Sequence, residues 1–279
     1  MGEITPHVST WDGLKLHIKE WFAGDQRAPL LCLPGLVRTG GDFAALAPLI
    51  GAGRRMVAID YAGRGGSGRA TKVERYAPEA CVRDVLDMCA ALHLHEVVAI
   101  GTSFGGLLAC ALAAARPGLL RAVVLNDVGP EIGSAGSDFV RTFVGLDPAL
   151  ESVDACIDFL RARLPPLSLT TEEEWRAMAM LTYAPGPDGR FHPRWDTRIA
   201  QLLTVQTPDL WPLFGALAPR PLLLVRGEIS TILLPETVAR MRVARPDMDV
   251  VSLPGIGHAP TLTEPAVVVA LRRFLDRVG

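Results

Sequence analysis

Apolar residues in this chain occur mainly as short continuous runs, separated by longer amphipathic stretches. Such runs predict strands covered on both faces, as in a parallel sheet, because a half-exposed strand would alternate apolar and polar residues. The runs lie at 29–33, 55–60, 96–101, 122–127, 221–226 and 249–253. Near the start of the chain, Asp12-Gly13 predicts a tight turn between two further strands at 8–10 and 14–20.

Helical spacing of apolar residues alternates with these strands, and it predicts helices at 78–92, 104–115 and 265–278. Alternating strands and helices are typical of an α/β fold with a mostly parallel central sheet flanked by helices. We therefore expect such a sheet at the centre of the chain.

The alternation stops between residues 131 and 217, where the pattern is mostly helical and interrupted by prolines. Helices are predicted at 152–164 and 171–183, the second with Thr171 and Glu174 spaced as a capping box. We expect a core domain formed by 1–130 and 218–279, interrupted by an inserted helical cap, 131–217.

Composition restricts the class of protein. The 279 residues carry a net charge of -2 and are 49% hydrophobic, which favours a globular chain with a large core and gives no electrostatic footprint for nucleic acid. The five cysteines form no CxxC or Cys/His cluster. We therefore expect buried free thiols, no disulfide framework and no metal site.

Targeting signals are not evident. The N-terminus lacks a basic segment followed by an apolar one, and the longest apolar stretch, Phe104–Ala115, is too short to span a bilayer. These features predict a cytoplasmic protein without membrane or nucleic-acid partners, and no pattern indicates an oligomeric state.

One motif carries clear chemistry. Gly101-Thr102-Ser103-Phe104-Gly105 matches G-x-S-x-G, follows a predicted strand and opens a predicted helix. In this context the glycines allow a tight turn that exposes a nucleophilic serine, while the helix N-terminus supplies unpaired N–H groups.

A second glycine motif has a different interpretation. Residues 63–68 fit the dinucleotide fingerprint G-x-G-x-x-G, but a polar stretch and no helix follows them. We expect no nucleotide and no other cofactor.

Several ordered motifs together resemble cap-bearing α/β-hydrolases, over nearly the whole chain. Besides the serine motif, these are the oxyanion-loop sequence Leu33-Pro34-Gly35-Leu36, the D-x-x-G-R-G-x-S loop at 60–67, Gly257-His258-Ala259-Pro260 and Glu264-Pro265. The resemblance implies an α/β-hydrolase fold and a serine hydrolase. Ser103 would attack a carbonyl carbon, with His258 as general base. Backbone N–H groups of Leu36 and Phe104 would form the oxyanion hole, because Pro34 has no N–H.

The acid that should orient His258 departs from the family pattern. Relatives carry Asp where this chain has Thr231, and threonine cannot stabilise an imidazolium by charge. Three alternatives stay open: Asp127 at the end of another strand supplies the carboxylate, Glu228 in the same loop replaces it, or Thr231 marks a natural or engineered weakening of the triad, which would lower turnover by about 10⁴-fold.

The predicted function is hydrolysis of a small-molecule carboxylic ester or lactone through an acyl-enzyme on Ser103. One alternative is a small-molecule receptor of the same fold with weak turnover; another is different Ser-His chemistry, such as C–C bond hydrolysis or peracid formation. Apolar side chains of the predicted cap are pocket or core candidates: Phe139, Phe143, Trp175, Met178, Trp195 and Trp211.

Overall fold

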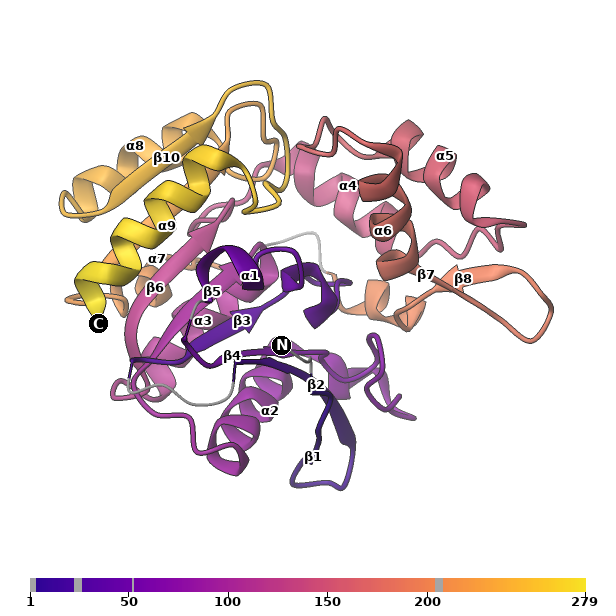
Figure 1. Ribbon diagram of the computed structural model, residues 1–279, viewed down its shortest axis with the longest axis horizontal. Helices are drawn as coiled ribbons and strands as arrows, with labels where there is room; N and C mark the ends of the chain where they lie inside the picture. Colours follow the sequence, from indigo (N-terminus) through magenta and orange to yellow (C-terminus); the bar gives the residue numbers. More distant parts are fainter. Residues whose placement is uncertain (1–3, 23–26, 52, 204–207) are drawn as a thin grey trace.

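The computed structural model describes residues 4–22, 27–51, 53–203 and 208–279. Its centre is an eight-stranded sheet with the order β1-β2-β4-β3-β5-β6-β9-β10 (Figure 1). The two pairs that involve β2 are antiparallel, and the other pairs in this sheet are parallel. The strands are β1 His7–Ser9, β2 Lys15–Trp21, β3 Leu30–Leu33, β4 Met56–Ile59, β5 Val97–Thr102, β6 Leu120–Asn126, β9 Leu222–Gly227 and β10 Asp249–Leu253.

The central strands read as continuous apolar runs because each of their faces meets a hydrophobic core. In β3, Leu31 and Leu33 pack into one core, whereas Leu30 and Cys32 pack into the other, and all four are fully buried. Adjacent residues of a strand point to opposite faces, so both sets must be apolar. The mostly parallel α/β architecture expected from the sequence is confirmed.

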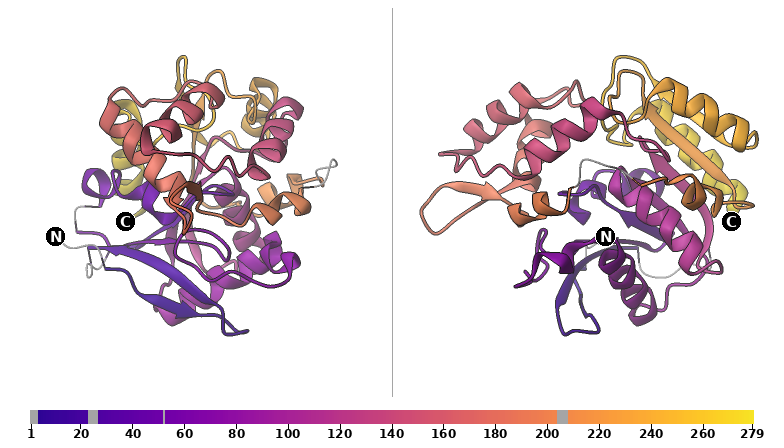
Figure 2. Two further views of the ribbon diagram at one scale, coloured as in Figure 1. Left: turned by 90° about the vertical axis from the view of Figure 1, so that its right-hand side faces the viewer. Right: turned by 180° about the vertical axis from the view of Figure 1, so that it is seen from behind.

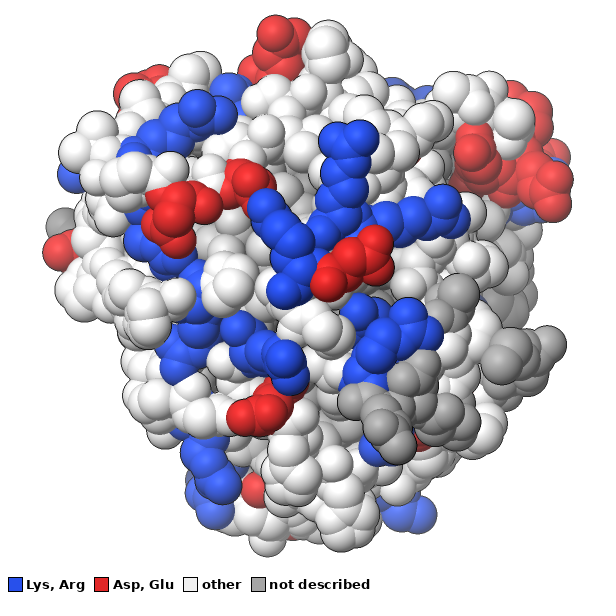
Figure 3. Space-filling view, turned by 60° about the vertical axis from the view of Figure 1, so that its left-hand side comes forward, with Lys and Arg blue, Asp and Glu red and all other residues white. Residues whose placement is uncertain are grey.

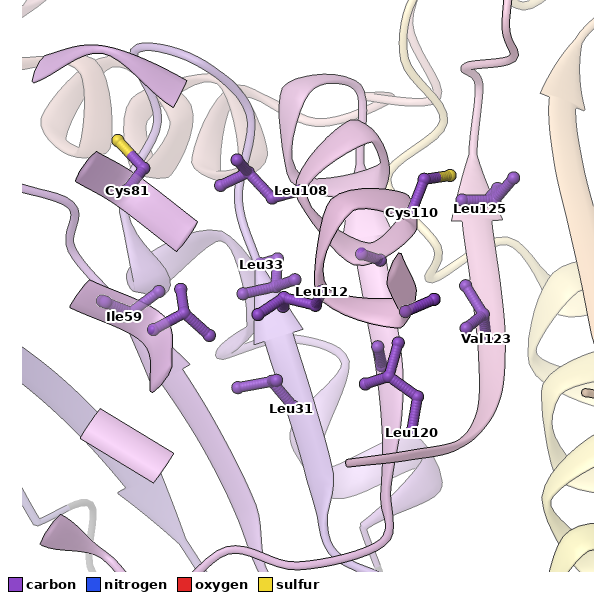
Figure 4. Close-up of a cluster of buried hydrophobic side chains, with 14 of the residues drawn as sticks. Leu31, Leu33, Ile59, Cys81, Leu108, Cys110, Leu112, Leu120, Val123 and Leu125 are labelled. Carbon is purple, nitrogen blue, oxygen red and sulfur yellow. The ribbon is translucent and has the colours of Figure 1, made fainter. Parts of the chain in front are cut away.

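Helices cover both faces of the sheet (Figures 1 and 2). Residues of α2 and α3 belong to one core, and residues of α1 and α9 belong to the other. Figure 4 shows α3 over the sheet, with Leu108 and Leu112 near Leu33. The helices outside residues 131–217 are α1 Ala47–Ile50, α2 Pro78–Ala91, α3 Phe104–Ala115, α8 Pro235–Ala244 and α9 Pro265–Val278, with the 3₁₀ helices η1 Gly40–Phe43 and η2 Val73–Tyr76.

Residues 131–217 lie between β6 and β9 in the chain. Their helices α4, α5 and α6 form a lobe beside the sheet, whereas α7 lies next to the sheet and contacts α3 (Figure 1). Buried residues of α5 and α6 form a small core of their own around Ile157 and Leu160. The predicted capping box of Thr171 and Glu174 is confirmed at the start of α6. The elements are α4 Ser134–Val144, α5 Val153–Arg163, α6 Glu172–Thr182, β7 Tyr183–Pro185, β8 Phe191–Pro193, η3 Thr197–Leu202 and α7 Trp211–Gly215.

The short hairpin of β7 and β8 is a feature that the sequence pattern missed. Each strand has only three residues and ends in proline, so neither shows a usable periodicity. The inserted segment is therefore mostly helical but not wholly so.

Other expectations concern cysteines, charge and membrane segments. All five cysteines are buried and free, as predicted. Acidic side chains interrupt the basic ones on the face drawn in Figure 3. Within the described ranges, no helix is long and apolar enough to cross a membrane. The prediction that no signal peptide is present rests partly on residues 1–3, which lie outside the described residues.

The direction of the parallel strands determines where chemistry can gather. The loops after β3, β5, β6, β9 and β10 all leave the same edge of the sheet, because parallel strands end on one side. Each sequence motif with a predicted catalytic role lies in one of these loops.

Candidate active site

Ser103 lies at the sharp turn between β5 and α3, with φ 52° and ψ -119°. A non-glycine residue with positive φ is strained and persists only where its surroundings hold it. The flanking glycines permit this turn. A Cβ on Gly101 would lie 2.5 Å from the Gly105 carbonyl oxygen, and one on Gly105 would overlap the Leu33 carbonyl oxygen. The turn places the Ser103 side chain beyond the carboxyl end of the sheet, as a nucleophile requires.

His258 lies in the loop between β10 and α9, and its Nε2 is 2.9 Å from Ser103 Oγ. Two backbone contacts hold this loop in place. Asn126 Nδ2 donates to the Pro260 carbonyl oxygen at 2.9 Å, and the Gly257 N–H donates to the Pro166 carbonyl oxygen at 2.7 Å. His258 is therefore within hydrogen-bonding distance of the serine hydroxyl that it would deprotonate.

Asp127 follows the last residue of β6 and has a φ of 56°. One carboxylate oxygen, Oδ2, is 2.8 Å from His258 Nδ1, and the other accepts the Gly227 N–H at 3.0 Å. The side chain is fully buried. A buried carboxylate at Nδ1 favours the tautomer that carries its proton there, which leaves Nε2 free to accept the proton of Ser103.

The other two residues considered for the acid lie elsewhere. Glu228 is exposed, and its Oε2 accepts the Gly255 N–H at 3.2 Å. Thr231 is also exposed, and its backbone carbonyl lies under the start of α4, close to Gly133 and Gly136. The structure brings Asp127 to His258 and leaves Glu228 and Thr231 away from its hydrogen bonds.

The predicted oxyanion donors flank Ser103. Leu36 lies in the turn after β3, and Phe104 is the first residue of α3. Across the described residues, neither backbone N–H donates to an acceptor. Helix N-termini carry such unpaired N–H groups, and two of them aimed at one point can stabilise a developing oxyanion.

Among the aromatic pocket or core candidates, Phe139, Phe143 and Trp195 form one stacked series. The rings of Phe139 and Phe143 stack at 5.7 Å, and Phe143 stacks on Trp195 at 5.8 Å. Trp195 is only 2% exposed and its Nε1 donates to the Val144 carbonyl oxygen, so its indole is part of the core. Trp175 lies on α6, beneath the Arg161 guanidinium, and packs with Phe143 against the small core of α5 and α6. Stacking and burial therefore account for Trp195, and Phe139 and Phe143 are half-buried on α4.

Met178 and Trp211, the other two aromatic or apolar candidates, contact polar groups. Met178 Sδ lies 3.0 Å from the Arg38 guanidinium, and Trp211 Nε1 donates to Glu131 at 2.9 Å. The first contact joins α6 to the loop after β3, and the second lies within residues 131–217.

Two residues near the site, Asn126 and Arg38, were not predicted from the sequence. Asn126 donates to Thr102 Oγ1 as well as to Pro260, so it ties the nucleophile strand to the His258 loop. Arg38 follows the oxyanion loop and donates to Thr182 Oγ1 on α6 while pairing with Asp42. No sequence signal indicated Asn126. Arg38, by contrast, lies two residues after Leu36, next to the loop that the sequence predicts to carry an oxyanion donor.

The D-x-x-G-R-G-x-S loop, residues 60–67, has no predicted catalytic role, but in the structure it contacts the oxyanion loop. Tyr61 and Arg64 are both fully or almost fully buried there. Burial raises the pKa of Tyr61 well above its ordinary value, so the phenol stays protonated and can donate. Burial lowers the pKa of Arg64, which nevertheless titrates far above neutral pH in proteins.

A sequence model of the alpha/beta hydrolase family matches residues 30–271. The chain belongs to the alpha/beta hydrolase family. Its fold agrees with a crystal structure of an alpha/beta hydrolase from Novosphingobium aromaticivorans DSM 12444, with a TM-score of 0.91 and 37% sequence identity over 99% of this chain and 98% of that one.

Curated relatives of this alpha/beta hydrolase are also named hydrolases. The chain is 32% identical to a 3-hydroxybutyrate-oligomer hydrolase from Cupriavidus necator, over 91% of this chain and 90% of that protein. It is 27% identical to a 2-(acetamidomethylene)succinate hydrolase from Mesorhizobium japonicum, over 79% and 78%. These similarities support a hydrolase activity on a small molecule.

Proposed function

We propose that this alpha/beta hydrolase is a serine hydrolase that cleaves a carboxylic ester or lactone. Ser103 is the nucleophile, His258 the general base and Asp127 the acid. The observation that carries the proposal is the continuous hydrogen-bonded series from Ser103 Oγ through His258 to Asp127, with distances of 2.9 and 2.8 Å. A weak hydroxyl nucleophile needs a base within this range, and the base needs a group that orients it.

Acylation begins when Ser103 Oγ attacks the carbonyl carbon of the ester. His258 Nε2 takes the hydroxyl proton, and the buried Asp127 carboxylate stabilises the imidazolium that forms. The carbonyl oxygen becomes an oxyanion, which accepts hydrogen bonds from the Leu36 and Phe104 N–H groups. Collapse of the tetrahedral intermediate expels the alcohol, which receives the proton from His258.

Deacylation repeats these steps with water. His258 takes a proton from the water molecule, the resulting hydroxide attacks the acyl carbon, and Ser103 leaves with the proton returned by His258. The products are the carboxylic acid and the regenerated enzyme. The intact Asp127 contact favours this turnover over a receptor whose triad has been weakened at Thr231.

For the substrate, we propose an ester of a short hydroxy acid. The support is the relative from Cupriavidus necator, whose name specifies 3-hydroxybutyrate oligomers and which aligns over nine-tenths of this chain. Such an oligomer carries ester bonds between small acyl units, which the proposed acyl-enzyme chemistry cleaves one at a time.

We also propose that residues 131–217 act as a cap over the site. Two contacts link them to catalytic loops: Thr182 accepts from Arg38 beside the oxyanion loop, and Pro166 accepts from Gly257 beside the histidine. A segment held on both loops can shield an acyl-enzyme from bulk water and select its substrate.

The test compares wild type with Ser103→Ala, using p-nitrophenyl butyrate, 3-hydroxybutyrate dimer and a fluorophosphonate label. Wild type should release a burst of p-nitrophenol and bind one label per chain, and Ser103→Ala should do neither. The matched control is Ser252→Ala, which removes an exposed hydroxyl on β10 and should retain both. Equal activity in Ser103→Ala, or a wild type without esterase activity and labelling, would contradict the proposal.

A further inference from the structure

The peptide between Gly35 and Leu36 carries the N–H that the proposed mechanism directs at the oxyanion. It lies in the turn after β3, outside any helix or strand, and its carbonyl oxygen, that of Gly35, accepts the Arg38 N–H at 3.1 Å. A donor contributes to catalysis only if it is already oriented when the negative charge develops. The turn hydrogen bond from Arg38 holds one side of this peptide, and the two peptide units that flank it need partners of their own.

Two side chains of one neighbouring loop bond the carbonyls on either side of that peptide. The Tyr61 hydroxyl donates to the Pro34 carbonyl oxygen at 3.2 Å, and Arg64 Nε donates to the Leu36 carbonyl oxygen at 2.9 Å. Because peptide units are planar, fixing the two flanking units restricts rotation of the Gly35–Leu36 unit between them. The Tyr61 ring also meets the Phe104 ring edge-on, at 5.7 Å, so the same loop contacts both oxyanion donors.

Arg64 is an unusual group to bury at this place. Arg64 is 1% exposed, and within the described ranges no carboxylate forms an ion pair with its guanidinium. Its Nη1 donates to the Ala62 carbonyl oxygen, and its guanidinium lies 5.8 and 5.7 Å from the ring centres of Tyr61 and Tyr76. Nη2 is buried and has no oxygen or nitrogen partner among the residues described; the Cys81 thiol, a weak acceptor, is the polar group beside the guanidinium.

Burial of this charge is costly for the fold. A desolvated cation without a paired anion is unfavourable, and an unsatisfied buried donor adds to that. Stability alone gives no reason to place an arginine here, since an apolar side chain of similar length would avoid both costs. A buried charge and an unsatisfied donor that are retained beside an active site indicate a functional role for the residue.

The backbone beneath Arg64 is fixed from two directions. Asp60 accepts the N–H groups of Gly40 and Gly66, at 2.7 and 2.9 Å. On the other side, the Gly65 N–H donates to the Arg194 carbonyl oxygen at 2.7 Å, which ties the loop to residues 131–217. These hydrogen bonds fix the backbone of the loop that carries the Arg64 side chain.

We propose that Arg64 is a positioning residue for the oxyanion hole, which holds the Leu36 carbonyl and thereby keeps the Leu36 N–H directed at the developing oxyanion. This inference rests on the proposed serine hydrolase function. Tyr61 supports the same peptide from the Pro34 side with a weaker, neutral hydrogen bond. Neither residue touches the substrate.

A second buried arginine offers a matched control. Arg54 donates to main-chain oxygens of Ala28, Leu275 and the final residue, Gly279, at 3.3, 2.9 and 2.7 Å. It precedes β4, at the end of that strand opposite the catalytic loops. Arg54 and Arg64 are thus both buried and bonded to main-chain oxygens, but of the two Arg64 is the one that contacts the oxyanion loop.

The experiment measures kcat and KM for p-nitrophenyl butyrate, the inhibition constant of butylboronic acid, and Tm, for wild type, Arg64→Met, Arg64→Lys and Arg54→Met. Butylboronic acid forms a tetrahedral adduct on a catalytic serine and so reports on the oxyanion hole. Loss of one oxyanion donor costs about 10²–10³-fold in kcat. Arg64→Met, which misaligns one, should lower kcat by about 10–100-fold and raise the inhibition constant by a similar factor, with KM within about threefold.

Arg64→Lys should recover part of both losses, because a lysine can donate one hydrogen bond to the Leu36 carbonyl. Arg54→Met should lower Tm while kcat and boronate inhibition stay within about threefold of wild type. Should Arg64→Met fail to fold, Tyr61→Phe must show the same pattern at about 3–10-fold, since it removes only the bond to Pro34.

The inference is overturned if Arg64→Met, or Tyr61→Phe in its place, behaves like Arg54→Met, with lower stability but unchanged kcat and boronate inhibition. It is also overturned if KM rises while kcat is retained, because this would indicate substrate binding rather than oxyanion stabilisation. Failure of the proposed function is a separate result, visible as a wild type that neither hydrolyses the ester nor reacts with the fluorophosphonate.

Discussion

The loops that follow β6 and β9 leave the same edge of the sheet from neighbouring strands, and each carries an acidic residue. Asp127, after β6, is buried against His258, whereas Glu228, after β9, is exposed and bonded to the Gly255 N–H. The backbone conformation at Asp127 and a backbone hydrogen bond to its carboxylate account for this difference. Asp127 adopts a φ of 56°, and the N–H of Gly227 at the end of β9 donates to its second oxygen. The β9 loop therefore supports the acid with a backbone N–H instead of supplying a carboxylate.

The β9 loop has a structural task instead. Ser230 Oγ accepts the N–H groups of Ile232 and Leu233, both at 3.2 Å, which closes the loop into a tight turn. The start of α4 packs on this turn, with Gly133 next to the Thr231 carbonyl oxygen. The loop thus contacts the start of α4 through its backbone, while the Thr231 side chain is exposed.

The largest expected effect comes from Asp127→Asn. The amide keeps the shape of the side chain but removes the charge that stabilises the imidazolium, so kcat for p-nitrophenyl butyrate should fall by about 10³–10⁴-fold. Glu228→Gln makes the same neutralisation in the neighbouring loop and should leave kcat within about threefold. A loss smaller than tenfold in Asp127→Asn, or a large loss in Glu228→Gln, would reverse the roles assigned to the two loops.

A substitution at the contact between the β9 loop and α4 should lower stability, whereas the Asp127 substitution should lower activity. Gly133→Ala places a methyl group against the Thr231 carbonyl oxygen and should lower the free energy of unfolding by about 1–3 kcal/mol, as other overpacked sites do. Urea denaturation measures this change. Gly118→Ala, at an exposed glycine with open space around its Cβ position, should change the free energy by less than about 0.5 kcal/mol. Equal stability of the two variants would show that the β9 loop does not seat α4.

The smallest effect should follow from placing an aspartate at residue 231, where the sequence analysis expected the acid. Thr231 is exposed and His258 Nδ1 already has a partner, so Thr231→Asp should alter kcat by no more than about threefold. Steady-state hydrolysis of p-nitrophenyl butyrate is sufficient to measure this. An increase of several orders of magnitude would mean that the wild-type triad is weakened.

Much of the fold could be predicted from the chain because local and tertiary signals agree. The helices at Phe104–Ala115 and Pro265–Val278 and the strand at Asp249–Leu253 occur with the predicted bounds. Buried parallel strands require continuous apolar runs, and their helices require amphipathic spacing. The β7–β8 hairpin could not be predicted, since three-residue strands carry too little pattern.

The site was harder to predict wherever it depends on distant segments. The elbow around Ser103 is local, and a strand, two glycines and a helix suffice to indicate it. Asp127 stayed one of three alternatives because its approach to His258 depends on the order β6-β9-β10, which no single segment encodes. The pocket candidates stay a prediction: periodicity shows that Trp195 faces inward, and the structure buries it in the core, but periodicity cannot show which inward side chains face a ligand.

The hydrogen bond between His258 Nδ1 and Asp127 tests the central claim most directly. In the proton NMR spectrum, an imidazole N–H bonded to a buried carboxylate gives a far-downfield resonance. Wild type should show this resonance, Asp127→Asn and His258→Ala should lose it, and Glu228→Gln and Thr231→Asp should keep it. Loss of the resonance in Glu228→Gln together with its retention in Asp127→Asn would contradict the assignment of Asp127 as the catalytic acid.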